Sequence, residues 1–347
     1  MSNIEVKKRL SNFELLRIVS MLIIVMHHYV VNSGLIDVIR NNPLNLYSLV
    51  LLVLGWGGKT AINCYILITG YFMCNQNITR KKFFKLLSEV LFYNIVIYCI
   101  FVISGYEVFS IKSFIKNIWP ISEVSNGFVS GFLIFYLLIP YLNILIKNMN
   151  KVQYMFLLSI LLSVYTLLPS LLKIKVVMNY VTWFSIIYLI AAYIRVYPEK
   201  IYDKKKLWQI LSLVTVLLSW VSVVVFVYIA VIAKKKDIIY AAYFWVNDSN
   251  RILALVTAIS VFMYFKNLNI PYNKFLNNIA ACTFGVLLIH ANSDTMRQWL
   301  WKDMLNNVGM YGNKFEFIHL LVSVISIYCI CTLIDSLRIR FLEKRFF

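Results

Sequence analysis

Long apolar runs without any alternation of polar and apolar residues constrain this chain more than any other feature. Each run is about twenty residues long, the length at which an α-helix crosses about 30 Å of hydrocarbon. Only 14% of the residues are charged, whereas soluble globular chains carry about 25%. The sequence therefore predicts an all-α, polytopic membrane helix bundle, and excludes a transmembrane β-barrel, a secreted disulfide scaffold and a disordered chain.

Ten of these runs are long enough to be membrane spans. A shorter apolar stretch, Leu44 to Leu54, stops at the Gly-Trp-Gly-Gly of residues 55–58 and is expected to be a half-helix at the outer face. No soluble domain and no repeat is recognisable, so residues 1–347 are predicted to form a single membrane domain. The ten predicted spans cover approximately residues 14–32, 58–74, 83–104, 127–147, 152–171, 177–196, 207–233, 250–266, 277–293 and 314–336.

The 34 Lys and Arg residues are distributed unevenly between the segments that connect the spans. An even number of spans places both termini on one side, and that side carries 21 of the 34. Basic residues concentrate on the cytoplasmic side, so both termini are predicted to be cytoplasmic. The net charge of +19 is explained in this way and indicates no nucleic-acid partner. The six cysteines show no metal-ligand spacing, so we expect no metal site.

The first span contains Glu14, Arg17 and two neighbouring histidines, and an ionisable residue there costs about 2.5 to 3.5 kcal/mol to insert. His27 points about 100° away from His28 and is expected to be a core histidine, which leaves Glu14, Arg17 and His28. At 100° per residue, Arg17 and His28 differ by about 20°, and Glu14 and His28 by about 40°. All three therefore share one helix face. A rise of 1.5 Å per residue separates Arg17 from His28 by roughly 16 Å along the axis. A cation at the cytoplasmic mouth and an imidazole deep inside suit a long ligand that is anionic at one end and reactive at the other, such as a coenzyme A thioester.

Each of these residues also has a structural interpretation. Arg17 can extend to the lipid headgroups, His28 can be a neutral core histidine, and Glu14 and Arg17 can form a surface ion pair. The basic cluster after the second span is explained equally well by phosphate binding and by the cytoplasmic excess of positive charge. This cluster consists of Arg80, Lys81 and Lys82.

The arrangement of Glu14, Arg17 and His28 resembles the first-helix signature of the integral-membrane acyltransferase-3 family. The resemblance extends along nearly the whole chain, with further motifs in the order that the family shows. Members are bacterial enzymes that O-acylate, usually O-acetylate, surface polysaccharides, and the chain looks closest to the capsule or exopolysaccharide type. The further motifs are LITGYF (67–72), FYLLIPYLN (135–143), YLIAAYIR (188–195) and TFGVLLIH (283–290).

The resemblance implies a catalytic site at His28 with Glu14. It further implies that acetyl-CoA, the acyl donor, is held at the cytoplasmic side by Arg17, Arg80, Lys81 and Lys82. Other polar residues of the motifs are expected to contact substrate, namely Thr69, Tyr71, Tyr136, Asn143 and His290. Polar residues within a span, such as Tyr136 and Asn143, more often serve helix packing than catalysis. The expected surroundings are a bacterial plasma membrane and its lipids, and the expected acceptor is a polysaccharide or a lipid-linked oligosaccharide.

Three positions depart from the family pattern. Glu14 replaces the usual Asp and Thr69 the usual Ser, which are mild changes, whereas Gly127 stands where relatives commonly carry Trp. The alternative function is a transporter or flippase of a lipid-linked glycan, although such proteins commonly show internal repeats, which this chain lacks. A purely structural membrane protein would leave the three ionisable residues on one helix face unexplained.

Overall fold

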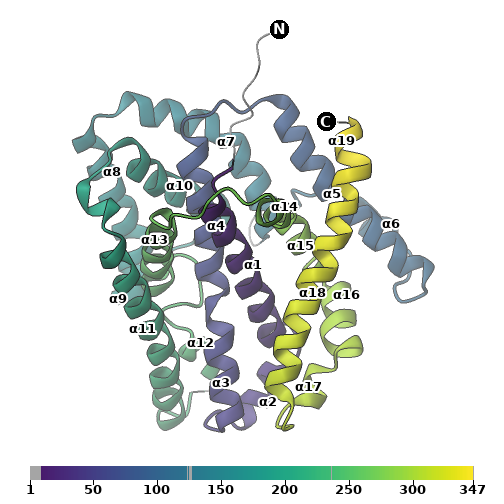
Figure 1. The fold of residues 1–347 in the computed structure, drawn as a ribbon. Helices are drawn as coiled ribbons and strands as arrows, with labels where there is room; N and C mark the ends of the chain where they lie inside the picture. Colours follow the sequence, from purple (N-terminus) through teal and green to yellow (C-terminus); the bar gives the residue numbers. More distant parts are fainter. Residues whose placement is uncertain (1–8, 123, 125–126, 236, 347) are drawn as a thin grey trace.

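The computed structural model describes residues 9–122, 124, 127–235 and 237–346. The helices among these residues pack side by side into one bundle, and the chain's first described residues and its last helix lie toward the same end (Figure 1). Each of the ten predicted spans coincides with a helical segment. Five are long single helices: α1 (Ser11–Val31), α5 (Arg80–Ile103), α7 (Phe128–Asn148), α11 (Lys205–Ile232) and α18 (Glu316–Arg338).

The remaining helices are either composite or short. Two composite segments are α3 (Leu46–Leu54), η1 (Gly55–Gly57) and α4 (Gly58–Met73), and α8 (Lys151–Leu162), η2 (Ser163–Leu167) and α9 (Leu168–Leu171). Four shorter helices of the bundle are α10 (Tyr180–Val196), α13 (Ile252–Lys266), α14 (Lys274–Ala281) and α15 (Thr283–His290). The other elements are α2 (Leu35–Asn41), α6 (Ile111–Ile118), η3 (Lys200–Asp203), α12 (Ile238–Ala242), α16 (Asp294–Arg297), η4 (Gln298–Met304), α17 (Asn307–Met310), η5 (Ile339–Glu343) and α19 (Lys344–Phe346).

Within the described part of the chain, seven helical segments are long and apolar enough to cross a membrane. An eighth candidate is a pair, Lys274–His290 and Asp294–Met310, whose two halves meet at a bend of 93°. The helices α10 and α13 are apolar but shorter. The chain is therefore a multi-pass membrane protein. The ten crossings and the cytoplasmic side of the termini stay predictions.

The expectation of a separate half-helix before residue 55 is wrong. The residues from Leu46 to Met73 form one helical segment of 28 residues. Glycine disfavours a helix by about 1 kcal/mol relative to alanine, which is why the sequence suggested a break here. The glycines instead allow close contact with α1, because a Cβ atom at Gly57 would meet the side chain of Ile23 and one at Gly58 would overlap the His27 ring.

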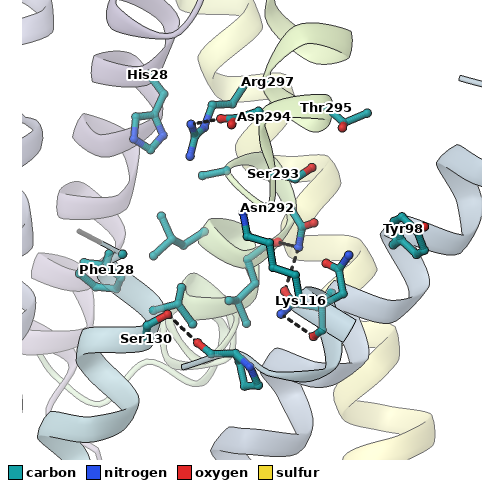
Figure 2. Close-up of a pocket in the computed structure, with 18 of the residues that line it drawn as sticks. His28, Tyr98, Lys116, Phe128, Ser130, Asn292, Ser293, Asp294, Thr295 and Arg297 are labelled. Carbon is teal, nitrogen blue, oxygen red and sulfur yellow. Dashed lines mark hydrogen bonds and ion pairs between the residues drawn. The ribbon is translucent and has the colours of Figure 1, made fainter. Parts of the chain in front are cut away.

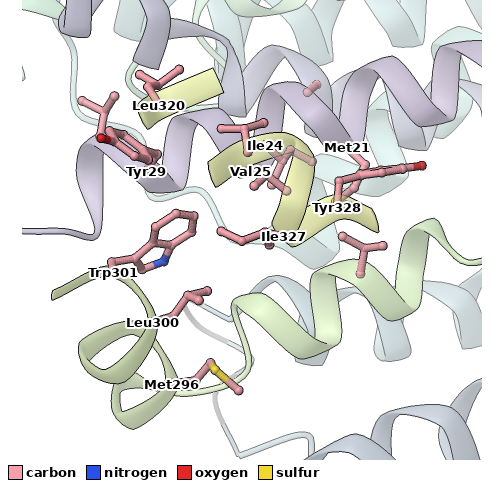
Figure 3. Packing of buried hydrophobic residues seen from close by; sticks show 14 of the residues in the cluster. Met21, Ile24, Val25, Tyr29, Met296, Leu300, Trp301, Leu320, Ile327 and Tyr328 are labelled. Carbon is pink, nitrogen blue, oxygen red and sulfur yellow. The ribbon is translucent and has the colours of Figure 1, made fainter. Parts of the chain in front are cut away.

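The helix α1 is central to the bundle. It packs against α4, α14, α15 and α18, while α4 also contacts α10 and α13. Figure 3 shows the buried apolar cluster around the second half of α1, where Tyr29 lies edge-on to Trp301 of η4, with ring centroids 6.1 Å apart. This packing holds the part of α1 that carries His28.

A buried cluster of charges joins α5 to α18. The Arg338 guanidinium lies 2.6 Å from Asp335, 3.0 Å from Glu89 and 3.2 Å from Glu343. Lys85 adds a second cation, 2.6 Å from Glu343. Asp335 is fully buried, so its charge depends on these neighbours for compensation.

Candidate active site

Two histidines that are 262 residues apart in the sequence form a hydrogen bond between two helices of the bundle. The Nδ1 atom of His28, on α1, lies 3.0 Å from the Nε2 atom of His290, the last residue of α15. His290 is fully buried, whereas His28 is only partly buried. The structure therefore turns the ionisable face of α1 into the bundle and gives its histidine a specific partner.

The hydrogen bonds define which ring nitrogens carry protons. The Nδ1 atom of His290 lies 2.6 Å from the carbonyl oxygen of Val286, which can only accept, so this nitrogen carries the proton. In a neutral ring the Nε2 atom of His290 then accepts, and His28 donates from Nδ1. The Nε2 atom of His28 is left with its lone pair, as a general base or a nucleophile requires.

His28 lines a cavity of about 770 Å³. Figure 2 shows His28 opposite the segment from Asn292 to Arg297, with the Arg297 side chain extending toward it. The walls are rich in polar and charged groups, among them Lys59, Tyr180, Asn292 and Arg297. A polar cavity of this size accommodates a hydroxyl-bearing substrate, for which an apolar pocket would offer no hydrogen bonds.

One wall of the cavity is the amphipathic helix α6. Its residues Ser113 and Asn117 line the cavity, and the side-chain amide of Asn94 donates to the Asn117 carbonyl at 3.2 Å. The opposite side exposes Ile111 and Ile115. Gly127, which precedes α7, also lines the cavity.

Sequence reasoning missed two cations of this cavity. Lys59 lies in the middle of the 28-residue helical segment, and its Nζ atom donates to the Tyr180 hydroxyl at 2.8 Å. Arg297 follows the sharp bend after α15 and pairs with Asp294. Lys59 would have been noticed if the segment had been recognised as one helix, because an ionisable residue within a span is a functional candidate.

Glu14 and Arg17 lie at the other end of α1. The Arg17 Nη1 atom is 2.8 and 2.9 Å from the two carboxylate oxygens of Glu14, and Glu14 is only 4% exposed. Fourteen residues separate Glu14 from His28, roughly 21 Å along a helix. Glu14 therefore positions Arg17 and is too distant to exchange a proton with His28 directly.

Thr69 and Tyr71 also lie toward the Arg17 end. The Thr69 hydroxyl donates to the Tyr65 carbonyl at 3.0 Å within the helix, and the Tyr65 hydroxyl donates to the Arg17 carbonyl at 3.1 Å. The Tyr71 hydroxyl accepts from Arg195 at 2.9 Å, and the same guanidinium lies 4.8 Å from the Tyr71 ring centroid. Tyr71 thus lies beside a cation, and neither Thr69 nor Tyr71 lines the His28 cavity.

The two predicted residues of α7 make packing contacts. The Asn143 amide donates to the Met73 carbonyl at 3.1 Å and accepts from the Tyr188 hydroxyl at 2.6 Å, which secures the end of α4. Tyr136 is buried against the Phe83 ring, with centroids 6.4 Å apart. The predicted phosphate-binding residues at the start of α5 are exposed: Arg80, Lys81 and Lys82.

The described residues contain no group of three or more His, Cys, Asp or Glu side chains that could hold a metal ion. The site is thus a histidine pair, a polar cavity and a separate cationic end within a bundle of membrane helices. A histidine whose ring nitrogen keeps its lone pair in a polar cavity is suited to act as a general base.

A comparison with known families identifies the class of protein. A family model described as an acyltransferase domain, acyltransferase-3, matches residues 10–335. The chain belongs to this family and is a membrane acyltransferase. Neither a comparison with curated proteins nor one with solved structures gives a match.

The hydrogen bond between the two histidines leads to a prediction for His290. Replacing His290 with Ala leaves His28 without the partner that orients its ring, and loss of orientation typically costs about 10²-fold in rate. We expect kcat for acyl transfer to fall by this order and KM for the acyl donor to stay unchanged. His290→Gln, whose amide oxygen can accept from His28, should recover part of the rate. An unchanged kcat in His290→Ala would contradict the positioning role.

Proposed function

We propose that this protein transfers an acyl group, most simply acetyl, from acyl-CoA to a hydroxyl of a surface polysaccharide or its lipid-linked precursor. The location would be the plasma membrane of a bacterium, with the termini in the cytoplasm. The observation that carries the proposal is the His28–His290 pair opening into a polar cavity. Membership of the acyltransferase family supports it.

In the proposed reaction the Nε2 atom of His28 removes the proton from the acceptor hydroxyl. The hydroxyl oxygen attacks the thioester carbonyl, the carbon–sulfur bond breaks, and an ester and the CoA thiolate form. His28 then returns the proton to the thiolate sulfur. Transfer through an acyl-His28 intermediate uses the same lone pair and gives the same products. Arg297, which extends toward His28, is suited to stabilise the negative charge on the carbonyl oxygen.

The cationic end of the bundle supports the choice of donor. Arg17, held by Glu14, follows Phe13 by one helical turn, and the Phe13 ring stacks on Tyr71, which pairs with Arg195. The basic residues at the start of α5 are exposed. Phosphate groups of CoA would bind there, and the pantetheine arm would cover the roughly 16 Å from Arg17 to His28. Under this proposal, Thr69 and Tyr71 contact the donor.

A substitution at Arg17 tests donor binding. In Arg17→Gln one charge-assisted interaction with phosphate is lost, so the KM for acetyl-CoA should rise roughly ten- to hundredfold while the protein remains folded. Release of CoA by the purified protein is the measurement. The matched control is Arg40→Gln. Arg40 lies on α2, which follows the end of α1 opposite to Arg17, so this change should leave the KM for acetyl-CoA unchanged. A protein that neither consumes nor binds acetyl-CoA would instead fit a transporter or flippase.

A further inference from the structure

Lys59 is the most unusual charge in the cavity because of its position. It lies in the middle of the apolar segment Leu46–Met73, where an ammonium group is costly. It lines the same cavity as His28, and the neighbouring Gly58 packs against the His27 ring. A charge at such a place, in the same cavity as His28, is a candidate for ligand binding.

The protein itself compensates this charge only in part. The Lys59 Nζ atom donates to the neutral Tyr180 hydroxyl at 2.8 Å and lies 5.4 Å from the centroid of the same ring. No Asp or Glu of the described residues lies within 4.0 Å of this ammonium group. The Tyr180 phenol offers a hydrogen bond but no opposite charge, and the Asp248 carboxylate attracts the ammonium only from beyond 4.0 Å. The ammonium can therefore accept a further, anionic partner at close range.

Other charged side chains on the cavity wall have other partners or another proposed role. Arg297 forms an ion pair with Asp294 and extends toward His28, where it is proposed to face the thioester carbonyl, and Glu107 accepts a hydrogen bond from the Thr295 hydroxyl at 2.8 Å. An anion that enters the cavity would therefore meet Lys59 without displacing a carboxylate. The Tyr180 hydroxyl, which faces the same ammonium, holds the side chain in place for this contact.

We propose that Lys59 binds an anionic group of the acyl acceptor, a carboxylate or a phosphate, and so selects acidic glycans. The inference rests on the proposed function and adds the chemical class of the acceptor. The donor is not the source of this anion, because Arg17 and the other donor-site cations lie toward the opposite end of α1. Binding of the acidic group beside His28 would bring a neighbouring hydroxyl to the Nε2 atom.

The test uses the glycan fraction of cells that lack this protein, because that fraction contains the unacylated acceptor. Purified protein and acetyl-CoA are supplied with the untreated fraction, with one whose carboxylates are reduced to alcohols, and with one whose phosphates are removed. We expect one of the two treatments to lower kcat/KM about tenfold or more, and that treatment names the source of the anion.

Variants at Lys59 complete the design. In Lys59→Met the untreated and treated fractions should be acylated at equal, low efficiency, whereas Lys59→Arg should keep the preference for the untreated one. Lys112→Met, on the exposed side of α6, is the control and should behave as the wild type. Equal acylation of all fractions by the wild type, or a preference that survives in Lys59→Met, would overturn this inference alone. Absence of any acyl transfer by the wild type would overturn the proposed function as well.

Discussion

A His28→Ala variant should fold and reach the membrane but lose acyl transfer, with a rate reduced by about 10²- to 10⁴-fold. The reason is the lone pair on Nε2, which the hydrogen bonds of His28 and His290 leave available in the cavity. Alanine removes that group and leaves a small space beside a cavity that is already open. The acyl content of the product glycan, measured by mass spectrometry, reports the result.

A second histidine provides the matched control. His319, on α18, bonds to the Tyr29 hydroxyl at 2.8 Å and does not line the His28 cavity. His319→Gln should therefore acylate at close to the wild-type rate. Full acylation by correctly inserted His28→Ala protein would refute the catalytic role of His28.

The largest effect on stability is expected for Arg338→Gln. This change leaves Asp335, Glu89 and Glu343 without their shared cation in a buried setting. Breaking a buried ion pair by removing one partner typically costs about 3 to 5 kcal/mol. The variant should unfold several degrees below the wild type in a thermal melt of the detergent-solubilised protein.

The same charge cluster contains its own control. Lys85 pairs with Glu343 at 2.6 Å, but its side chain is 46% exposed. Exposed ion pairs contribute about 0 to 1 kcal/mol, so Lys85→Gln should change the melting temperature little. Equal melting temperatures for Arg338→Gln and the wild type would show that the three carboxylates do not depend on Arg338.

The helical segments of this fold could be predicted because the physics of a bilayer acts on each span separately. A run of apolar residues becomes a helix whatever its neighbours are, since the backbone must satisfy its own hydrogen bonds. The wrong prediction of a helix break at residues 55–58 arose because this region depends on contacts between two helices. The preference of Gly57 and Gly58 against a helix is local, but their contacts with Ile23 and His27 belong to a second helix and cannot be read from either segment alone.

In the candidate site, too, the residues of a single helix could be predicted, whereas contacts between helices could not. Glu14, Arg17 and His28 share a face of one helix, so helical periodicity alone brings them together. The pairing of His28 with His290 joins α1 to α15, and helical periodicity within one span cannot show which histidine of another helix will be the partner. Lys59 was missed because the sequence predicted two separate segments here. Lys59 then stood at the start of a span, whereas in the structure it lies in the middle of one helical segment.

The hydrogen bond from His290 to the Val286 carbonyl limits where protons can move within the bundle. A carbonyl oxygen cannot take up and pass on a proton, so the chain of hydrogen bonds from His28 ends inside α15. The pair therefore provides no continuous path for protons beyond His290, and it exchanges protons only at the Nε2 atom of His28 in the cavity. In the proposed reaction no proton would cross the bilayer by way of His290, so a voltage across the membrane would not move charge along this route.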